Sequence, residues 1–359
     1  MSRVYNFSAG PAALPLAVLE TIREDIPDWQ GTGMSVLEVS HRSKEFVELA
    51  ARCEANLREL LSISEDYSVI WTQGGATMQM AMVPLNLTAP GDTVDYVQTG
   101  SWGKKAIAEA KKVCNVHIAA DSSDSNFTCI PDEGTWSRSE NAVYLHITSN
   151  ETIAGVEFYE PPGGDVPVVS DMSSTILSRP IDVSQYGVIY AGAQKNIGPA
   201  GITLVIVRKD LLEPKREGLP HLMMWKSYAE SGSMTNTPPT FAWYVADLVF
   251  QHLLSTGGLE AMARLNQRKS EKLYAAIDAS DFYSNPVADH CRSSMNVPFI
   301  LADSALDSSF LETSKAAGLT NLKGHRSVGG MRASIYNAVP EAAVDALVEF
   351  MAEFERTNG

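Results

Sequence analysis

The segment Ala191-Gly-Ala-Gln-Lys195-Asn-Ile-Gly-Pro-Ala-Gly201 joins two continuous apolar runs, Val188–Ala191 and Ile202–Val207. Such runs are typical of strands that helices cover on both faces, so the segment predicts a tight loop between two strands of a central sheet. Lys195 on this loop has small and apolar neighbours and no carboxylate nearby in the sequence. Desolvation there would lower the pKa of its amine and make it a better nucleophile. The alternative is a surface lysine on a connecting loop.

More β-rich apolar runs precede this loop, at Ser68–Trp71, Thr93–Val97, Val116–Ile118, Val143–Ile147 and Val166–Ser170. Helical patterns alternate with these runs, for example at Trp102–Lys112, where apolar residues recur at helical spacing. This alternation predicts an α/β architecture in which helices pack on a mostly parallel sheet.

The C-terminal part of the chain follows a different pattern. Two long helical segments, Thr240–Leu254 and Leu259 to about Ala279, are separated by a glycine pair at 257–258. Strands at Val297–Leu301 and Met331–Ile335 and further helices then predict a smaller α+β unit, whose last helix opens at Pro340. A chain of 359 residues is also longer than most domains with a single hydrophobic core. We therefore expect two domains with a boundary near residue 257.

Composition narrows the class of partner. The formal net charge of −15 argues against nucleic acid and against an anionic membrane surface, although a local basic cluster could still bind an acidic substrate. No apolar segment approaches the roughly 20 residues that span a bilayer, and no secretory signal is expected at the N-terminus. The four cysteines form no CxxC pair, so we expect neither a metal site nor disulfides, and we expect a cytoplasmic protein.

Other residues are placed to support chemistry at Lys195. Asp171 follows the Val166–Ser170 strand, at the end of a parallel sheet where ligands bind, and a buried carboxylate there needs a cationic partner. The alternative is that Asp171 caps a following helix. The segment Gln73-Gly-Gly-Ala-Thr-Met-Gln79 predicts a helix beginning near Thr77, whose free N–H groups suit a phosphate. Trp102 could stack on a flat ring, or it could be a core tryptophan.

Six segments spread over the chain strongly resemble the phosphoserine aminotransferase family, which belongs to the class V aminotransferases. They are Asn6-Phe-Ser-Ala-Gly-Pro11, Glu38-Val-Ser-His-Arg42, Ser173-Ser-Thr-Ile-Leu-Ser-Arg-Pro180, Gly192-Ala-Gln-Lys-Asn-Ile-Gly-Pro-Ala-Gly201, Asn236-Thr-Pro-Pro-Thr240 and Lys323-Gly-His-Arg326. The resemblance implies the fold type I of pyridoxal 5′-phosphate (PLP) enzymes, with a mixed, mostly parallel seven-stranded sheet. It implies a large PLP-binding domain at 16–257, a small α+β domain at 258–359, and a segment at 1–15 that packs with the small domain.

The resemblance also assigns cofactor residues. Lys195 is similar to the lysine that holds PLP as a Schiff base, and Asp171 to the partner of the pyridine nitrogen; these two would be the catalytic residues. Trp102 resembles the ring-stacking residue, and Thr152 the hydroxyl that bonds the phenolic oxygen of the cofactor. The phosphate group would be held by Ala76, Thr77, Gln194 and, from the partner subunit, Asn236 and Thr237. A homodimer with shared active sites is therefore implied.

The substrate residues follow from the same resemblance. The phosphate anchors would be His41, Arg42, His325 and Arg326, with contributions from both chains, and Arg332 would clamp the α-carboxylate. The implied reaction is reversible amino transfer between glutamate and 3-phosphohydroxypyruvate, giving phosphoserine and 2-oxoglutarate in serine biosynthesis. Some bacterial members also act on a phosphorylated threonine derivative in pyridoxine biosynthesis. Thr77 stands where one branch of the family has an arginine, and Ala9 where some members have a serine.

Two alternatives stay open at this point. One is another enzyme of the same fold, such as a cysteine desulfurase or an alanine–glyoxylate aminotransferase. A desulfurase needs an exposed nucleophilic cysteine on a flexible loop, for which Cys291 is the only candidate in the smaller domain. The other is a non-catalytic binding module that retains the fold, which loss of Lys195, Asp171 or Arg332 would have marked.

Overall fold

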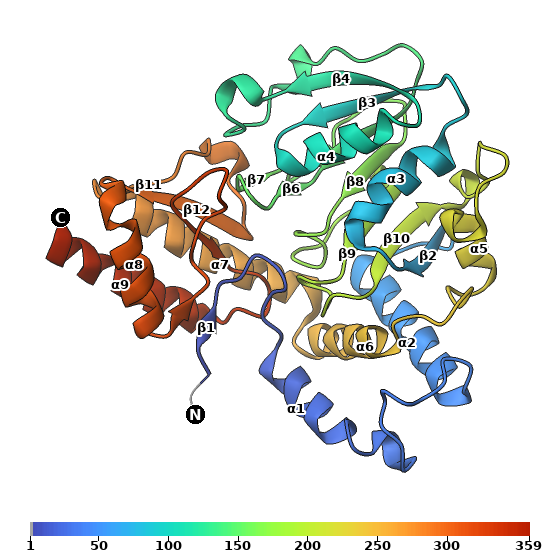
Figure 1. Cartoon of the computed structure of the whole chain (residues 1–359), viewed down its shortest axis with the longest axis horizontal. Helices are drawn as coiled ribbons and strands as arrows, with labels where there is room; N and C mark the ends of the chain where they lie inside the picture. Colours follow the sequence, from blue (N-terminus) through green and yellow to red (C-terminus); the bar gives the residue numbers. More distant parts are fainter. Residues whose placement is uncertain (1–2) are drawn as a thin grey trace.

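A seven-stranded sheet forms the centre of the larger unit in the computed structural model, which describes residues 3–359 (Figure 1). The strand order is β2-β10-β9-β8-β5-β3-β4, and only β10 runs antiparallel to its neighbours. This confirms the predicted mixed, mostly parallel sheet. The strands are β2 (Tyr67–Thr72), β3 (Thr93–Gln98), β4 (Asn115–Asp121), β5 (Ala142–Thr148), β8 (Val168–Asp171), β9 (Val188–Gly192) and β10 (Thr203–Arg208).

Helices cover both faces of the sheet, which explains why its strands are apolar throughout. Along β10, Leu204 and Ile206 pack into one core with α2 and α6, whereas Val205 and Val207 pack into a second core with α3, α4 and α5. Because successive side chains of a strand point to opposite faces, both faces need apolar residues. The helices of this unit are α1 (Leu16–Asp25), α2 (Lys44–Leu61), α3 (Gly75–Leu87), α4 (Ser101–Ala110), α5 (Trp225–Glu230) and α6 (Thr240–Ser255).

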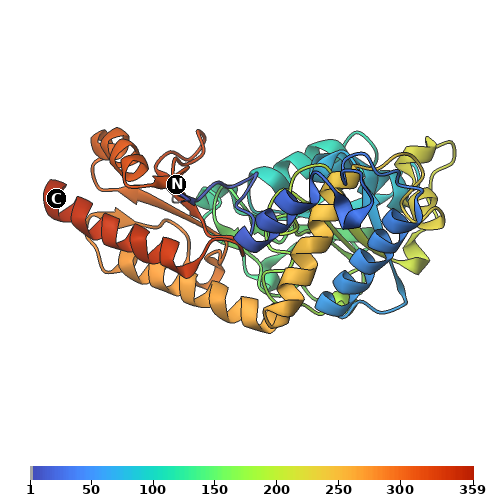
Figure 2. The same ribbon diagram turned by 90° about the horizontal axis from the view of Figure 1, so that it is seen from below.

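The smaller unit has its own sheet and its own core. An antiparallel sheet of order β11-β12-β14 packs with the three long C-terminal helices, beside the larger unit in Figure 2. The last of these helices begins one residue after Pro340, which is its N-cap. The elements are α7 (Gly258–Asp278), α8 (Asp307–Ala316), α9 (Glu341–Asn358), β11 (Tyr283–Ser284), β12 (Asn296–Leu301) and β14 (Met331–Ser334).

The N-terminal segment lies with the smaller unit. Strand β1 (Tyr5–Asn6) pairs in parallel with β13 (Leu319–Thr320), and Phe7 is buried in the C-terminal core. Farther along the segment, Ala12 N donates to Gln194 O and Leu14 packs against the core of the larger unit, so the packing of residues 1–15 with the small domain stays a prediction, and residues 1 and 2 lie outside the described part. The predicted boundary near residue 257 falls between α6 and α7, and it stays a prediction.

The strand ends and helix starts of the larger unit meet on the side that faces the smaller unit (Figure 1). Two of these helices begin slightly earlier than expected. Helix α3 starts at Gly75 rather than near Thr77, because Gly74 and Gly75 adopt φ of 88° and 67° and so form the turn into the helix themselves. Helix α4 starts at Ser101, which places Trp102 in its first turn.

Candidate active site

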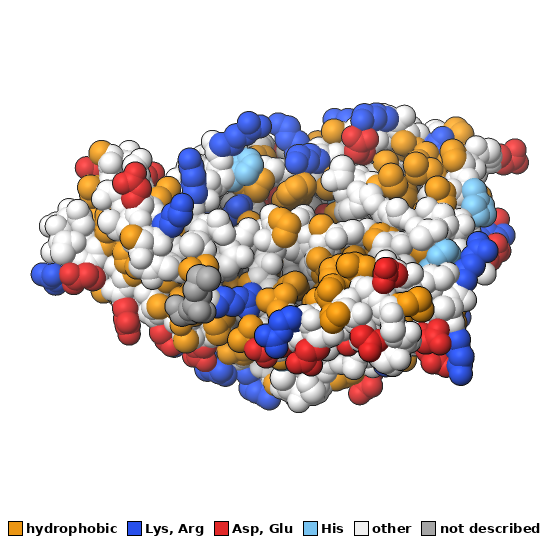
Figure 3. Space-filling model, turned by 60° about the horizontal axis from the view of Figure 1, so that its bottom comes forward, with side chains coloured by type: hydrophobic (Ala, Val, Ile, Leu, Met, Phe, Trp, Pro, Cys, Tyr) orange, Lys and Arg blue, Asp and Glu red, His pale blue; other side chains and the backbone are white. Residues whose placement is uncertain are grey.

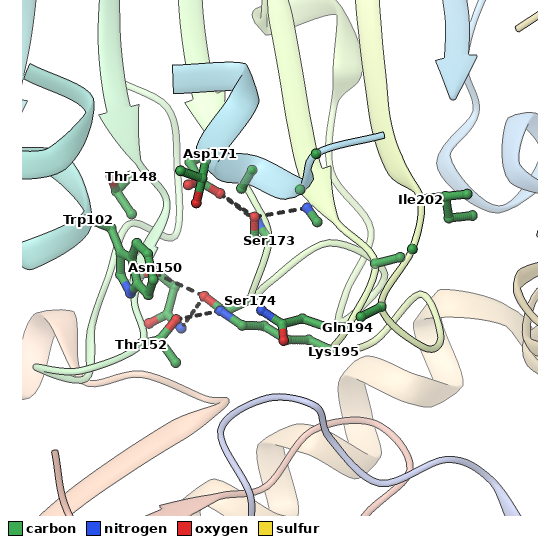
Figure 4. Close-up of a pocket in the computed structure, with 18 residues that line it drawn as sticks. Trp102, Thr148, Asn150, Thr152, Asp171, Ser173, Ser174, Gln194, Lys195 and Ile202 are labelled. Carbon is green, nitrogen blue, oxygen red and sulfur yellow. Dashed lines mark hydrogen bonds between the residues drawn. The ribbon is translucent and has the colours of Figure 1, made fainter. Parts of the chain in front are cut away.

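Lys195 lies in the loop between β9 and β10, as predicted, and its side chain points into a cavity (Figure 4). The side chain is buried, and Nζ donates a hydrogen bond to Thr152 Oγ1 at 2.7 Å. Burial lowers the pKa of the Lys195 amine to about 8, although the nearby Asp171 carboxylate opposes that shift. Burial therefore favours the neutral, nucleophilic form of this amine, and Lys195 lines the cavity.

Asp171 is the last residue of β8, and its carboxylate is buried at the end of the strand. Its Oδ1 accepts hydrogen bonds from the backbone N–H of Ser173 at 2.9 Å and from Ser173 Oγ at 2.6 Å. The segment after Asp171 forms turns, so the alternative of a helix cap is wrong. Burial raises the pKa of this carboxyl. Within residues 3–359 its hydrogen bonds fall on Oδ1, which leaves Oδ2 for a cationic ligand.

The start of helix α3 forms the end of the cavity that suits an anion. Gly74, Gly75, Ala76 and Thr77 all line the cavity. The first N–H groups of a helix lack intrahelical acceptors, and the helix dipole adds partial positive charge there. A side chain at Gly74 would collide with Met78, since an added Cβ would lie 2.7 Å from Met78 Cβ. The two glycines therefore present backbone, and no side chain, to this end of the cavity.

The cavity has a volume of about 340 Å³ and brings most of the predicted cofactor residues together. Those that line it are Ala76, Thr77, Trp102, Thr152, Asp171, Gln194 and Lys195. Asn236 and Thr237 do not line it, but Gln73 Nε2 donates to Thr237 O at 3.2 Å and lies 3.5 Å from Asn236 Oδ1. Both of these residues are exposed in the single chain. The cavity thus combines an amine, an acid, an aromatic ring and an anion site.

Arg332 connects the smaller unit to this cavity. It lies on β14, and its Nη1 donates to the backbone oxygen of Thr152 at 3.1 Å. Thr152 therefore binds Lys195 through its hydroxyl and Arg332 through its carbonyl. His325 lies near Arg332 and Arg326, and burial together with these cations lowers the pKa of its imidazole. One predicted phosphate residue, His325, is thus within electrostatic range of the predicted carboxylate clamp, Arg332.

His41 and Arg42 are not brought to the cavity of the same chain. His41 is buried, and its Nε2 has no hydrogen-bond partner within residues 3–359, whereas Arg42 is exposed. Both residues precede α2, and the exposed hydrophobic side chains Met34, Leu37 and Val47 surround them in the sequence. Their predicted role therefore depends on a second chain.

Sequence patterns missed several polar residues that line the cavity, Asn150 and Ser173 among them, and the buried Glu151 next to it. Asn150 and Ser173 line the cavity, and Ser173 Oγ also accepts a hydrogen bond from the backbone N–H of Gly192 at 3.0 Å. Glu151 is fully buried between Asn150 and Thr152. The signal that could have found Asn150 and Glu151 is their position directly after the strand that ends at Thr148, since polar residues at a strand end are candidates for a site.

Cys291, the candidate nucleophile of a desulfurase, is not an exposed thiol. Cys291 is buried and its thiol pKa is raised by that burial, so the exposed cysteine that a desulfurase needs is not found there. Among residues 3–359 no group of histidine, cysteine and acidic side chains could hold a metal ion. In the same range, none of the helices has the length and apolar character of a membrane span.

Comparisons with known proteins agree with this geometry. The model of the family "Aminotransferase class-V" matches residues 4–347. The phosphoserine aminotransferase of Hahella chejuensis is 56% identical over 357 residues, which cover 99% of both chains. The solved structure of phosphoserine aminotransferase from Bacillus circulans subsp. alkalophilus has a TM-score of 0.97 at 46% identity and covers 99% of both chains. The PLP-bound phosphoserine aminotransferase from Trichomonas vaginalis has a TM-score of 0.94 at 41% identity, with coverage of 98% of this chain and 100% of that one.

Proposed function

The chain belongs to the aminotransferase class-V family, and from that membership and its site we infer that it is a PLP-dependent aminotransferase that acts on phosphoserine. The reaction is reversible amino transfer between glutamate and 3-phosphohydroxypyruvate, which gives O-phospho-L-serine and 2-oxoglutarate and serves serine biosynthesis. The observation that carries this proposal is the position of Thr152. Its hydroxyl accepts a hydrogen bond from the Lys195 amine, and its backbone oxygen accepts one from the Arg332 guanidinium. A lysine that can move protons thus lies beside a cation that can hold a carboxylate.

The cavity fits PLP because each part of that molecule finds a suitable group. The Asp171 carboxylate, buried and with Oδ2 unoccupied among the described residues, suits a protonated pyridine nitrogen. The N–H groups at the start of α3, with Gln194, suit the phosphate, and Trp102 suits the flat ring. Lys195 suits the aldehyde, and the Thr152 hydroxyl suits the phenolic oxygen. When bound, PLP takes up the amino group and withdraws electrons from the substrate α-carbon.

The residues of this chain supply binding, orientation and proton transfer. With the cofactor bound, Lys195 Nζ would accept the proton from the substrate α-carbon and return it to the carbon on the other side of the amino nitrogen, because its lowered pKa suits a base near neutral pH. The Thr152 hydroxyl orients that amine through a hydrogen bond. The Arg332 guanidinium binds the α-carboxylate as a planar fork, so the α-carbon is placed within reach of Lys195.

Selectivity for the phosphorylated substrate rests on the His-Arg pairs. His325 lies close enough to both Arg326 and Arg332 to be influenced by their charges, so we expect a substrate held by its carboxylate at Arg332 to place its phosphate near this pair. In a chain of net charge −15, such a cluster of cations is a local basic site for a dianion. The second pair, His41 and Arg42, would complete this phosphate site from the partner subunit.

We include a homodimer with shared active sites in this proposal. Its support is that Asn236 and Thr237 are exposed beside Gln73, and that the segment around His41 carries exposed hydrophobic side chains, with Met34 48%, Leu37 55% and Val47 46% exposed. Figure 3 shows hydrophobic side chains gathered near the middle of one face of the molecule. Such surface is unusual on a monomer and typical of an interface. A cytoplasmic location, predicted from the cysteines, is also part of the proposal.

Complementation tests the shared site. Chains with Lys195→Ala, mixed under exchange conditions with chains changed to alanine at Asn236 and Thr237, should regain activity, because one site of each heterodimer would contain only intact groups. Mixtures that never exceed the sum of the parents would confine the site to one chain.

Substrate half-reactions test the function. The PLP-loaded protein should change its visible absorbance with glutamate and with phosphoserine, and kcat/KM should be at least roughly tenfold lower for unphosphorylated serine, which loses charge-assisted hydrogen bonds. An absorbance change with serine as efficient as with phosphoserine would contradict the substrate assignment. No change with glutamate would contradict the aminotransferase itself.

A further inference from the structure

Glu151 is a buried carboxylate to which the mechanism above gives no role. It belongs to β6 (Asn150–Glu151), and its side chain is 0% exposed. Its neighbours Asn150 and Thr152 line the cavity, whereas Glu151 does not. An ionised carboxylate is costly to bury without hydrogen bonds or a cation. The groups that bind the Glu151 carboxylate therefore indicate its role.

The partners of Glu151 are backbone groups in the first turn of helix α4. Oε2 accepts from the N–H of Trp102 at 3.0 Å, and Oε1 accepts from the N–H of Gly103 at 2.8 Å. The N-cap of α4 is Gly100, which has no side chain to bind these N–H groups. Glu151 therefore does, from a distant part of the sequence, what an N-cap side chain usually does, and its charge also favours the N-terminal end of the helix dipole.

The Glu151 carboxylate occupies the space that a side chain at position 100 would need. A Cβ added at Gly100 would lie 2.4 Å from Glu151 Cδ, so a side chain there would displace the carboxylate. The φ of Gly100 is 167°, an extended value that any residue adopts. A residue without a side chain is thus needed at position 100 to admit Glu151, and not to allow the backbone conformation.

The helix start that Glu151 binds carries the aromatic ring of the site. Trp102 lines the cavity, and the centroid of its ring lies 6.0 Å from Lys195 Nζ. The indole Nε1 is buried and has no hydrogen-bond partner within residues 3–359, so hydrogen bonding of the side chain does not fix the ring there. The backbone of Trp102 is held by Glu151, next in sequence to the Thr152 that binds Lys195.

We propose that Glu151 is a positioning residue, which binds the first turn of α4 and thereby fixes the Trp102 ring at the cavity where PLP binds. The inference rests on the proposed function, because it needs PLP as the ligand of that ring. Glu151 acts through Trp102, and its contribution to PLP binding depends on that indole. Burial raises the pKa of the Glu151 carboxyl to about 7, and the two N–H groups of α4 oppose that shift.

A double-mutant cycle on PLP affinity tests this coupling. PLP is titrated into apo-protein and followed by absorbance, for wild type, Glu151→Gln, Trp102→Ala and the double variant. Glu151→Gln keeps the size of the side chain but sets an amide donor against an N–H, and should weaken PLP binding by roughly tenfold or more. In the Trp102→Ala background the same change should cost less than about threefold.

Two further variants separate positioning from loss of folding. Gly100→Ala leaves Glu151 intact but should displace it, and should weaken PLP binding in the same Trp102-dependent way. Asp95→Asn is the matched control, because Asp95, on β3, is also a buried carboxylate that accepts from a backbone N–H, that of Ser139 at 2.9 Å, and it does not line the cavity. It should change PLP affinity by less than about twofold, with near-ultraviolet circular dichroism recorded for all variants as the check on folding.

The outcomes distinguish the two levels of the proposal. Equal losses from Glu151→Gln with and without Trp102 would overturn the positioning role, while PLP binding by the wild type would leave the proposed function intact. Unchanged affinity in both Glu151→Gln and Gly100→Ala would overturn it as well. A wild-type protein that fails to bind PLP would overturn the proposed function and this inference together.

Discussion

Two lysines of this chain are buried, one at the end of the central sheet and one in the smaller unit. Burial lowers the pKa of Lys195 to about 8 and that of Lys269 to about 7. By burial and pKa alone, Lys269 would be the better candidate for a reactive amine. Its surroundings exclude that role.

The two lysines differ in how many hydrogen bonds their amines make and in whether the amine faces a cavity. Lys269 Nζ, on α7, lies 2.8, 2.9 and 3.1 Å from the backbone oxygens of Ile335, Tyr336 and Val339, so its donors are occupied by carbonyl groups. Lys195 Nζ has one hydrogen bond, to a hydroxyl, and faces a cavity. A perturbed pKa marks a reactive group when an unoccupied volume and a charge partner accompany it. The Lys269 amine is influenced by the Glu341 carboxylate, but carbonyl oxygens occupy its donors and leave none for a ligand, so it ties the turn after β14 to helix α7.

Removal of the two amines should have opposite consequences, and Lys195→Ala should give the largest effect. Because the variant lacks the base for proton transfer, transamination should fall by at least about 10²–10⁴-fold, while the thermal midpoint stays within a few degrees. Steady-state kinetics and a melting curve measure both. Lys269→Met should retain kcat within a few-fold. A comparable loss of activity in both variants would contradict the claim that only Lys195 acts in catalysis.

Asp171→Ala should give the next largest effect, because it leaves the Lys195 amine in place but removes the buried carboxylate. Loss of one partner of a buried charge pair costs about 3–5 kcal/mol, which corresponds to a hundredfold to several-thousandfold slower chemical step. Single-turnover kinetics with glutamate measure that step. Near-normal rates would mean that the Asp171 carboxylate has no part in the chemistry at Lys195.

Substrate cations should give intermediate and selective effects at the Lys195 site. Arg42→Ala and Arg326→Ala should lower kcat/KM for phosphoserine by roughly tenfold to a hundredfold, the value of a lost charge-assisted hydrogen bond, and should affect glutamate less. Arg332→Ala should lower both, because both substrates carry an α-carboxylate. Equal losses for glutamate and phosphoserine in the Arg42 and Arg326 variants would contradict a dedicated phosphate site.

Lys269→Met should give the smallest effect on activity and a measurable effect on stability. Three carbonyl groups lose a donor, which should lower the free energy of unfolding by roughly 1–3 kcal/mol. Because the folded-state pKa of Lys269 lies below its ordinary value of 10.5, the unfolded chain binds more protons between about pH 7 and 10.5, and stability rises with pH in that window. Denaturant titrations from pH 7 to pH 9 should show that this rise is weaker in the variant. An identical pH dependence in both proteins would argue that Lys269 is not a buried titrating amine.

The same contrast shows what sequence patterns can locate. Lys195 and Asp171 were found because each follows a continuous apolar strand, and the ends of adjacent strands meet at one edge of a sheet. Lys269 lies on a helix with many charged residues and would ordinarily be expected to face solvent. Its acceptors belong to a distant turn, and no local pattern predicts that contact. The cap that Glu151 provides for α4 is likewise a contact between residues far apart in the sequence. The predicted role of His41 and Arg42 requires a partner subunit, which no local pattern describes.

The most direct test of the account is chemical labelling of the amine that reacts with the cofactor. Borohydride reduction of the PLP-loaded protein, followed by proteolysis and mass spectrometry, should place the phosphopyridoxyl group on the peptide that contains Lys195 and leave the Lys269 peptide unlabelled. A label on Lys269, or on any lysine outside the β9–β10 loop, would contradict the assignment of the active site.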